Sequence, residues 1–477
     1  MTENYTNLAL FIDGKWLGPE GRSTAEVINP ATEKTLALLP LASRVDLDNA
    51  LQAAQRGFAV WSATSAHERA VIIRKAAQLM RERVEHMAQL MTLEEGKTLG
   101  ESRREILGSA DILDWYAEEG RRIYGRSIPG RTRGTRQLVV REPIGPVAAF
   151  TPWNFPVLTP VRKIGGALAS GCSCILKAAE ETPACALEIA RCLADAGLPD
   201  GVLNLVFGVP SEISECLIQS PIIKKVSFTG STQVGRLIGK LAAEGPKPTS
   251  MELGGHAPVI VFDDANVKEV IAASMRKFGN AGQSCISPTR FYIHAALYDD
   301  FVDGMAKMVN GIKIGPGLDP ESRMGPLANE RRIAMMEELI SDAKAKGARV
   351  AAGGKRGPSP GFYWEPTVLA DVPLHARIMN EEPFGPVMVV NSFTTHDEVI
   401  TEANRLPVGL AAYAFTANAA TAIELGERLE SGMVGINTYN ISTEDTPFGG
   451  VKHSGWGSEG GSEALDSYLT TKFIIQS

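Results

Sequence analysis

The sequence predicts an α/β protein with two domains, each built around a parallel sheet, and a small β extension. Two observations lead to this prediction: apolar residues recur at helical spacing before residue 125, and short apolar runs then alternate with helical stretches in two successive series. Such alternation is typical of βαβ units, which form parallel sheets. A chain of 477 residues with 44% hydrophobic content is long enough for two or three domains.

The expected elements can be placed in chain order. Asp13-Gly14 supplies the positive φ angles of a two-residue turn, which predicts a hairpin over residues 8–17. Helical spacing is present at 45–61, 67–95 and 103–124. The first series of strands is expected at 147–150, 174–176, 202–206 and 226–228. The second is expected at 258–262, 291–293, near Val350 and at 387–390. The domain boundary should lie near Glu252 to Gly255, and residues 130–142 and 467–475 should form strands outside both cores.

Composition argues against several classes of protein. The formal net charge of −7 provides no positive field that would attract nucleic acid. A polar N-terminus, and prolines within the apolar runs, predict neither a signal peptide nor a membrane span. Six cysteines are too few for a disulfide scaffold, which fits a reducing cytoplasm, and five of them should be buried structural thiols. The seven histidines lack metal-ligand spacing, so we expect no catalytic metal.

Two segments contain residues suited to catalysis. Cys285 ends the sequence Gly282–Cys285 in a predicted loop, where a thiol is accessible, although most loop cysteines are structural. Glu252 lies between apolar residues in Met251–Gly255, at the end of a predicted strand. A carboxyl group there should be partly desolvated, which raises its pKa toward the range that a general base needs. A solvated glutamate is the alternative, so neither segment is specific by itself.

Taken in order, the motifs resemble those of the aldehyde dehydrogenase superfamily over nearly the whole chain. They are Thr151-Pro152-Trp153-Asn154-Phe155-Pro156, Lys177-Ala178-Ala179-Glu180, Phe228-Thr229-Gly230-Ser231-Thr232-Gln233-Val234-Gly235, the Glu252 and Cys285 segments, Glu381-Glu382-Pro383-Phe384-Gly385-Pro386 and Pro447-Phe448-Gly449-Gly450-Val451-Lys452. The resemblance implies a Rossmann-like NAD(P)-binding domain at 1–122 and 144–254. It also implies a catalytic domain at 255–458 and oligomerisation segments at 123–143 and 459–477.

The resemblance assigns three catalytic residues. It implies that Cys285 is the nucleophile, that Glu252 is the base for thioester hydrolysis, and that Asn154 stabilises the oxyanion together with the Cys285 N–H. One such amide donor is typically worth ~100- to 1,000-fold in rate. An aldehyde would be oxidised to a carboxylic acid through a thiohemiacetal and a thioester on Cys285. Relatives that transfer the acyl group to coenzyme A lack this glutamate, so Glu252 favours hydrolysis by water. For Asn154 alone, a proline-bounded turn would be the simpler interpretation.

The cofactor site is predicted from weaker signals. The usual Gly-x-Gly-x-x-Gly sequence is missing, and Gly230, Ser231 and Gly235 offer a helix N-terminus for a pyrophosphate instead. Lys177 and Glu180 follow a strand, and the resemblance implies that both contact the adenine ribose. A carboxylate there would repel a 2′-phosphate, so NAD is the preferred cofactor and NADP the alternative. The resemblance adds as cofactor contacts Thr151, Pro152, Trp153, Gly208, Leu253, Glu382 and Phe384.

The substrate is predicted chiefly from Arg162, in the helix that follows the Asn154 turn. A cation in the substrate pocket would pair with a carboxylate at the far end of the aldehyde, and the segment from Pro156 to Lys163 resembles the succinate-semialdehyde dehydrogenases. Ser442 also resembles the substrate hydroxyl of that subgroup. A cation on a helix surface is the alternative for Arg162. The remaining expected substrate contacts are Phe155 and Ser284.

Two positions depart from that subgroup. Gly279 stands where a second arginine is usual, and Ser287 stands where a second cysteine is frequent, so no redox disulfide with Cys285 can form there. Loss of one of two charged contacts would weaken carboxylate binding by roughly 1.5 to 3 kcal/mol. A longer or aromatic anionic aldehyde, or broad specificity, is therefore an alternative substrate prediction.

Two other classes of protein, a cysteine hydrolase and a non-catalytic binding protein, would require different residues. A cysteine hydrolase usually takes histidine as its base, and His256 and His453 lie nearest to the motifs. A non-catalytic binding protein of this fold would not need Cys285, Glu252 and Asn154 together. The predicted strands outside the cores would leave unpaired edges, so we expect a homodimer or a homotetramer.

Overall fold

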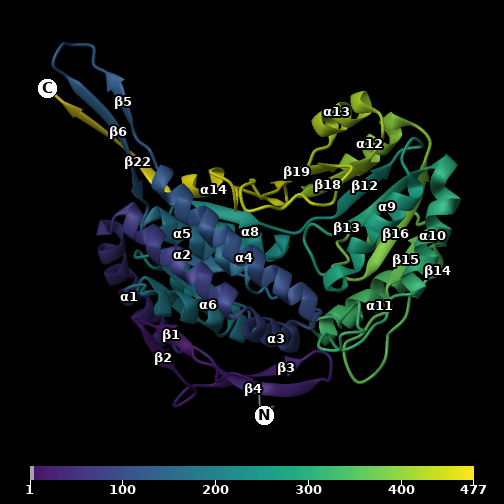
Figure 1. Ribbon diagram of the computed structural model, residues 1–477, viewed down its shortest axis with the longest axis horizontal. Helices are drawn as coiled ribbons and strands as arrows, with labels where there is room; N and C mark the ends of the chain where they lie inside the picture. The colour runs from purple at the N-terminus through teal and green to yellow at the C-terminus, as the bar shows by residue number, and fades with distance from the viewer. Residues whose placement is uncertain (1–4) are drawn as a thin grey trace.

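The computed structural model describes residues 5–477, which form two α/β lobes and a narrow projecting sheet (Figure 1). The first lobe surrounds an eight-stranded sheet and the second a seven-stranded sheet. The first sheet has the order β2 (Lys15–Leu17), β1 (Leu10–Ile12), β9 (Leu203–Val206), β8 (Cys174–Lys177), β7 (Val147–Phe150), β10 (Lys225–Thr229), β11 (Thr249–Glu252) and β21 (Gly455–Trp456). Its five central strands are parallel, as the alternating pattern predicts, and antiparallel strands pair at both edges.

The second sheet is also mainly parallel. Its order is β14 (Arg349–Ala352), β15 (Thr367–Ala370), β16 (Val387–Phe393), β13 (Pro288–His294), β12 (Ala257–Val261), β18 (Ala411–Phe415) and β19 (Met433–Ile436). Only β14 pairs antiparallel with its neighbour. The helices of this lobe are α9 (Val267–Ser274), α10 (Tyr298–Asn310), α11 (Glu330–Ala345), α12 (His396–Asn404) and α13 (Ala419–Arg428). A short ribbon of β17 (Val408–Gly409) and β20 (Val451–Lys452) lies beside it.

Helices cover the first sheet, and several begin at a capping box. They are α1 (Arg44–Ala63), α2 (Ala66–Glu82), α3 (Val84–Glu95), α4 (Leu99–Glu119), α5 (Leu158–Ser170), α6 (Pro183–Ala196), α7 (Pro210–Gln219) and α8 (Thr232–Glu244). Ser65 with Glu68 caps α2, and Thr98 with Glu101 caps α4. The predicted helix over 67–95 is wrong in one respect, because it is interrupted at Arg83, whose φ of −98° and ψ of 10° leave the helical region. Neither proline nor glycine marks that break.

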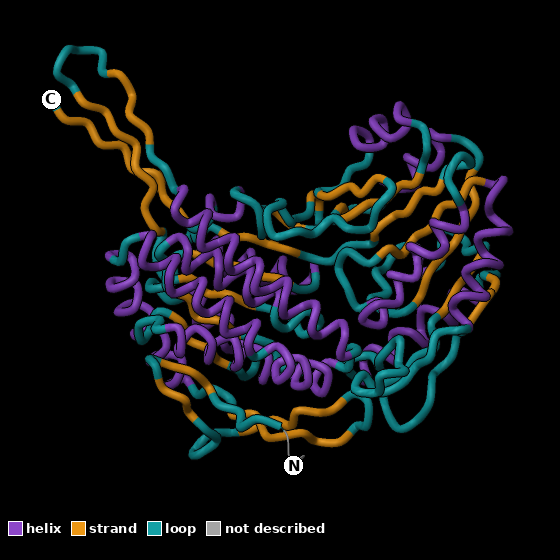
Figure 2. The backbone as a smooth tube through the Cα atoms, in the orientation of Figure 1, coloured by secondary structure: helices purple, strands orange, loops and turns teal. Residues whose placement is uncertain are grey.

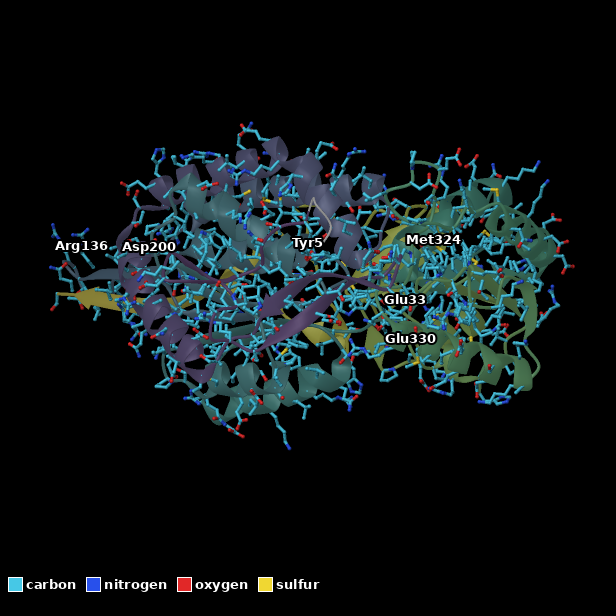
Figure 3. All side chains as sticks on the ribbon, turned by 90° about the horizontal axis from the view of Figure 1, so that it is seen from below. Tyr5, Glu33, Arg136, Asp200, Met324 and Glu330 are labelled. Atoms are coloured by element: carbon cyan, nitrogen blue, oxygen red, sulfur yellow. The ribbon has the colours of Figure 1, made fainter. Side chains whose placement is uncertain are left out.

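A hairpin that the sequence did not predict connects the two lobes. It consists of β3 (Thr24–Asn29) and β4 (Lys34–Pro40), which cross beneath both lobes (Figures 1 and 2). At its turn, Glu33 Oε1 accepts a hydrogen bond of 2.7 Å from the Gly361 N–H. The Phe362 N–H of the second lobe also donates to the Pro30 carbonyl at 2.9 Å, and in the view from below Glu33 lies on the same side as Met324 and Glu330 (Figure 3). The hairpin therefore links the lobes on the side where the chain begins.

The projecting sheet contains the two predicted outer strands. It has the order β22 (Leu469–Gln476), β6 (Arg136–Pro143) and β5 (Arg126–Pro129), and Arg136 lies at its outer end (Figure 3). Phe473 and Ile475 are 56% and 58% exposed on it. The short helix α14 (Glu463–Asp466) that precedes β22 belongs to the first lobe. Its Leu465, and Tyr468 after it, are buried in the core of that lobe. No helix among residues 5–477 is both long and apolar enough to cross a membrane.

Candidate active site

A cavity of about 800 Å³ lies between the lobes and is lined by residues of both. The three predicted catalytic residues, Cys285, Glu252 and Asn154, all line it. They come from three separate parts of the fold: the loop before β13, the end of β11 and the turn after β7. The parallel strands bring the last two together, because β7 and β11 flank β10 and end at the same edge of the sheet.

Cys285 follows a strained turn that fixes its loop. Asn280 and Ala281 both have positive φ angles, of 49° and 48°, within the 3₁₀ segment η2 (Met275–Gly282). A Cβ at Gly282 would lie 2.1 Å from the Gly385 carbonyl oxygen, so only glycine fits there. Burial, and after it the facing Glu252, raise the pKa of the Cys285 thiol. The resting thiol therefore needs a base beside it before it can attack.

Glu252 has the properties expected of such a base. It ends β11 between Thr229 of β10 and Gly455 of β21, and it is 3% exposed. Burial, and after it the neighbouring Glu459, raise the pKa of Glu252 to about 8. Its Oε1 is buried and has no hydrogen-bond partner among residues 5–477. A water or a reacting group in the cavity can supply that missing contact.

Asn154 is held at both its side chain and its backbone. Its Nδ2 donates to the Gln283 carbonyl at 3.0 Å, which uses one of the two N–H donors of the amide. Its own carbonyl accepts from Asn280 Nδ2 at 2.9 Å and from Lys97 Nζ at 2.8 Å. The proposed oxyanion donor is thus tied directly to the loop that carries the nucleophile.

The nicotinamide end of the predicted cofactor site belongs to the same cavity. Gly230 and Ser231 line it at the N-terminus of α8, where the Ser231 hydroxyl accepts from the Val234 N–H. Gly235 is required by packing, since a Cβ there would lie 2.4 Å from Leu253 Cδ2. The other predicted contacts that line the cavity are Pro152, Trp153, Leu253, Glu382 and Phe384. An exposed helix N-terminus with a capping hydroxyl suits a pyrophosphate.

The residues predicted to contact the adenine ribose do not line this cavity. Among them, Lys177 and Glu180 form an ion pair of 2.7 Å. The other Glu180 oxygen accepts from the Gly208 N–H at 3.0 Å, so these three predicted residues are together. Thr151 lies beside them, with its N–H donating to the Lys177 carbonyl at 3.2 Å. A half-exposed carboxylate next to a lysine suits the hydroxyl groups of a ribose, so both ends of this surface fit a dinucleotide.

The predicted substrate residues line the other half of the cavity. Arg162 is only 3% exposed, so the alternative of a surface helix cation is wrong. Its Nη2 donates to Ser442 Oγ at 2.8 Å, and its guanidinium lies 3.9 Å from the centroid of the Phe448 ring. Phe155 and Ser284 also line this half.

Several residues of the site were not predicted from the sequence. Arg104, Arg276, Tyr413 and Tyr439 also line the cavity. Glu459 lines it too, and it forms a buried ion pair with Lys163 in α5. None of them lies in a recognisable motif, and only the fold brings them together.

The rival base His256 does not belong to the site. Its ring nitrogens form hydrogen bonds with Thr289 Oγ1 at 2.7 Å and the Ile378 carbonyl at 2.9 Å, within the second lobe. His453 is exposed and contacts Arg236. Four of the other five cysteines are buried as predicted, whereas Cys216 is only half-buried. Among residues 5–477, Cys285 is the one cysteine that lines the cavity.

Comparisons with known proteins agree with this geometry. Residues 16–474 match the aldehyde dehydrogenase family. The chain is 47% identical to 4-(hydroxymethyl)benzenesulfonate dehydrogenase of Comamonas testosteroni, covering 98% of this chain and 97% of that protein. It is 43% identical to the NADP(+) succinate-semialdehyde dehydrogenase of Escherichia coli, covering 97% and 96%. A crystal structure described as an E. coli NADP dependent enzyme matches with a TM-score of 0.97 and 42% identity, covering 99% and 98%. The resemblance seen in the motifs and the predicted fold are therefore confirmed, and this chain belongs to the aldehyde dehydrogenase family.

Proposed function

We propose that this protein oxidises an aldehyde that carries an anionic group, with succinate semialdehyde as the first candidate. The observation behind this proposal is the environment of Arg162. Its guanidinium is buried, lines the cavity beside Cys285, and forms no ion pair with a carboxylate within 4.0 Å among residues 5–477. A buried cation without a counterion is unfavourable unless a ligand supplies the charge. A carboxylate at the far end of the substrate would do so.

The proposed cycle uses three residues of the cavity. Glu252 accepts the proton of the Cys285 thiol, and the sulfur attacks the aldehyde carbon to give a thiohemiacetal. The second N–H of Asn154 and the Cys285 backbone N–H hold the developing oxyanion. When bound, the nicotinamide accepts the hydride that leaves the aldehyde carbon. Glu252 releases the thiol proton to solvent and then accepts a proton from a water molecule, whose oxygen attacks the thioester; the Cys285 sulfur leaves and the carboxylic acid is released.

For the cofactor we propose NAD in preference to NADP, with no metal. Glu180 and Lys177 would hold the adenine ribose, and Gly208 would keep the Glu180 carboxylate in place. A 2′-phosphate would lie against this carboxylate, although the adjacent Lys177 offsets part of the repulsion. Among the relatives, the E. coli succinate-semialdehyde dehydrogenase is named for NADP(+), so the ratio of the two cofactors is a direct test.

An aromatic anionic aldehyde is the second candidate, and Gly279 favours it. With φ of −59° and ψ of 142°, position 279 does not require glycine, and its nearest neighbour would be a flexible Glu101 oxygen at 3.3 Å. The missing side chain leaves space for a wider substrate. Rings of Phe155, Tyr413, Tyr439 and Phe448 line the cavity, as aromatic substrates require. The relative that acts on a benzenesulfonate compound agrees with this alternative.

The test compares kcat/KM for succinate semialdehyde, butanal, 4-carboxybenzaldehyde and benzaldehyde. In the wild type, each anionic aldehyde should exceed its uncharged counterpart by at least about tenfold, since a buried charged hydrogen bond is worth ~1.5–3 kcal/mol. Arg162→Met should remove this difference and leave the uncharged aldehydes little changed. If the wild type oxidises uncharged aldehydes as well as anionic ones, and Arg162→Met changes neither, the protein is a broad-specificity aldehyde dehydrogenase.

We also propose that the projecting sheet pairs with another copy of the chain. Its exposed apolar residues and free strand edges are unfavourable in a monomer. Light scattering should report a dimer or a tetramer, and Ile475→Asp should shift it toward smaller species.

A further inference from the structure

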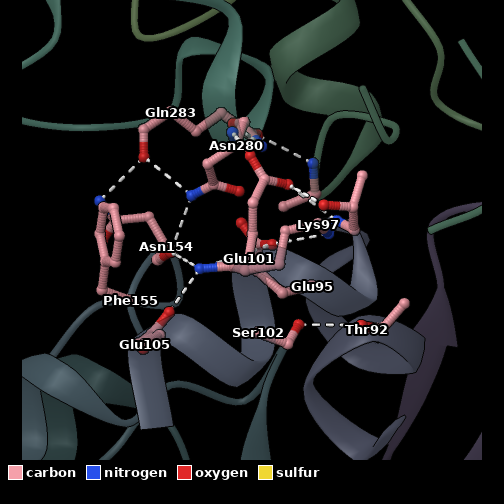
Figure 4. Close-up of polar contacts among 12 residues, drawn as sticks. Thr92, Glu95, Lys97, Glu101, Ser102, Glu105, Asn154, Phe155, Asn280 and Gln283 are labelled. Atoms are coloured by element: carbon pink, nitrogen blue, oxygen red, sulfur yellow. Dashed lines mark hydrogen bonds and ion pairs between the residues drawn. The ribbon is translucent and has the colours of Figure 1, made fainter. Parts of the chain in front are cut away.

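A buried ion pair lies directly behind the Asn154 turn. Lys97, between α3 and α4, donates from Nζ to Glu105 Oε2 at 2.6 Å (Figure 4). The two side chains are 1% and 3% exposed. Burial of two charges costs several kcal/mol per ion, so such a pair contributes little net stability compared with apolar residues of the same size. Its presence here is better explained by what the two residues contact.

Each partner holds one end of the turn that carries Asn154. Lys97 Nζ donates to the Asn154 carbonyl at 2.8 Å. Glu105 Oε1 accepts from the N–H groups of Val157 and Leu158 at 2.9 and 3.1 Å, where α5 begins. One charged pair, from α4 and the turn before it, therefore fixes the backbone from the Asn154 carbonyl to the start of α5.

The same helix also holds the nucleophile loop. Glu101 Oε1 accepts from the Asn280 N–H at 2.8 Å, and Asn280 Nδ2 donates to the Asn154 carbonyl that Lys97 contacts (Figure 4). The Phe155 ring lies 4.3 Å from Lys97 Nζ. The Asn154 carbonyl is thus one of the points at which the first lobe and the Cys285 loop are joined.

We propose that Lys97 and Glu105 are positioning residues that aim the Asn154 amide at the substrate oxygen. This inference rests on the proposed function, in which Asn154 stabilises the oxyanion. Lys97 acts through the Asn154 backbone and takes no part in proton transfer. Displacement of a catalytic group by about 1 Å can lower the rate on the order of 100-fold. A substitution at Lys97 or Glu105 should therefore lower kcat.

The test is a double-mutant cycle on the full-length enzyme. Lys97→Met should lower kcat about 10- to 100-fold in the wild type, and less than about threefold in Asn154→Ala, because the group that it positions is then missing. Arg22→Met is the matched control, since it breaks an ion pair with Asp46 outside the cavity. Its effect should be small, and equal in both backgrounds. An equal loss from Lys97→Met in both backgrounds would overturn the proposal.

Two further measurements separate positioning from a general structural effect. NAD affinity, and the rate at which iodoacetamide alkylates Cys285, should change less than about twofold in Lys97→Met, because alkylation develops no oxyanion. If that variant does not fold, Glu105→Gln replaces it, since an amide oxygen still accepts from the Val157 and Leu158 N–H groups. Normal activity of Asn154→Ala would contradict the proposed function itself. Loss of activity in Asn154→Ala, with none in Lys97→Met or Glu105→Gln, would contradict only the positioning role.

Discussion

A Cβ on Gly254 would lie 2.7 Å from Oε2 of Glu382, so this glycine leaves the space that the half-buried Glu382 carboxylate occupies. Gly254→Ala should displace Glu382 and raise KM for NAD about tenfold, which corresponds to the loss of one good hydrogen bond. The value of kcat should change much less. Initial rates of NADH formation at saturating aldehyde measure both constants. Gly239→Ala in α8 is the control, because its nearest neighbour would be 3.7 Å away. An equal change in both variants would contradict this role of Gly254.

The pH dependence of hydrolysis follows from Glu252. Because burial raises its pKa to about 8, most of this carboxyl group is protonated at pH 7 and cannot accept a proton from water. Steady-state kcat limited by hydrolysis should rise about tenfold per pH unit below pH 8 and level off above it. Because Glu252 is also the proposed acceptor of the Cys285 proton, Glu252→Gln should lower both the initial NADH burst and the steady-state rate, and the remaining rate should lack this pH dependence. A Glu252→Gln enzyme with the unchanged profile would show that another group is the base.

Glu180 should control the choice between the two cofactors. Glu180→Gln removes the charge that faces a 2′-phosphate and keeps Lys177, so kcat/KM for NADP should rise relative to NAD by about tenfold. Parallel assays with the two cofactors give the ratio. The neighbouring Glu181, which pairs with Arg331 instead, provides the control variant Glu181→Gln, for which no change is expected. An unaltered ratio in Glu180→Gln would place the 2′ position elsewhere.

We expect His256 to contribute to the free energy of unfolding and not to the catalysed reaction. His256→Leu leaves two buried polar groups without this partner, and the free energy of unfolding should fall by about 1–3 kcal/mol. The pKa of His256 is well below its usual value because the ring is buried, so it carries no charge near neutral pH. Denaturant unfolding, with exposed His453→Leu as the control, measures the first effect. A large loss of kcat in folded His256→Leu would contradict this prediction and would support a cysteine hydrolase that uses His256 as its base.

The sequence was informative wherever one local pattern determines one element. The run Val147–Phe150 is apolar throughout because both faces of β7 are covered, and its bounds agree with the prediction. Asp13-Gly14 likewise turns between β1 and β2 as predicted. The break at Arg83 was missed because helical spacing continues through it.

Parts of the site depend on contacts between distant segments. Lys97 and Asn154 are 57 residues apart, and Arg162 and Ser442 are 280 apart. Lys97, which follows a glycine, and Arg104, one turn into α4, have no local signature that separates either of them from a solvated cation. The motifs around Glu252 and Cys285 were recognisable because glycines, needed for close backbone approach, flank both residues.

The short strand β21 has a consequence for the order in which the enzyme is built. Its residue Gly455 pairs with Glu252. The hydroxyl of the adjacent Ser454 donates at 2.8 Å to the carbonyl of Gly254, which lies 200 residues earlier in the chain. During synthesis, the segment that carries Glu252 therefore leaves the ribosome long before the strand that covers it. We therefore expect the surroundings of Glu252, the proposed base, to be complete only after almost all of the second lobe has been translated.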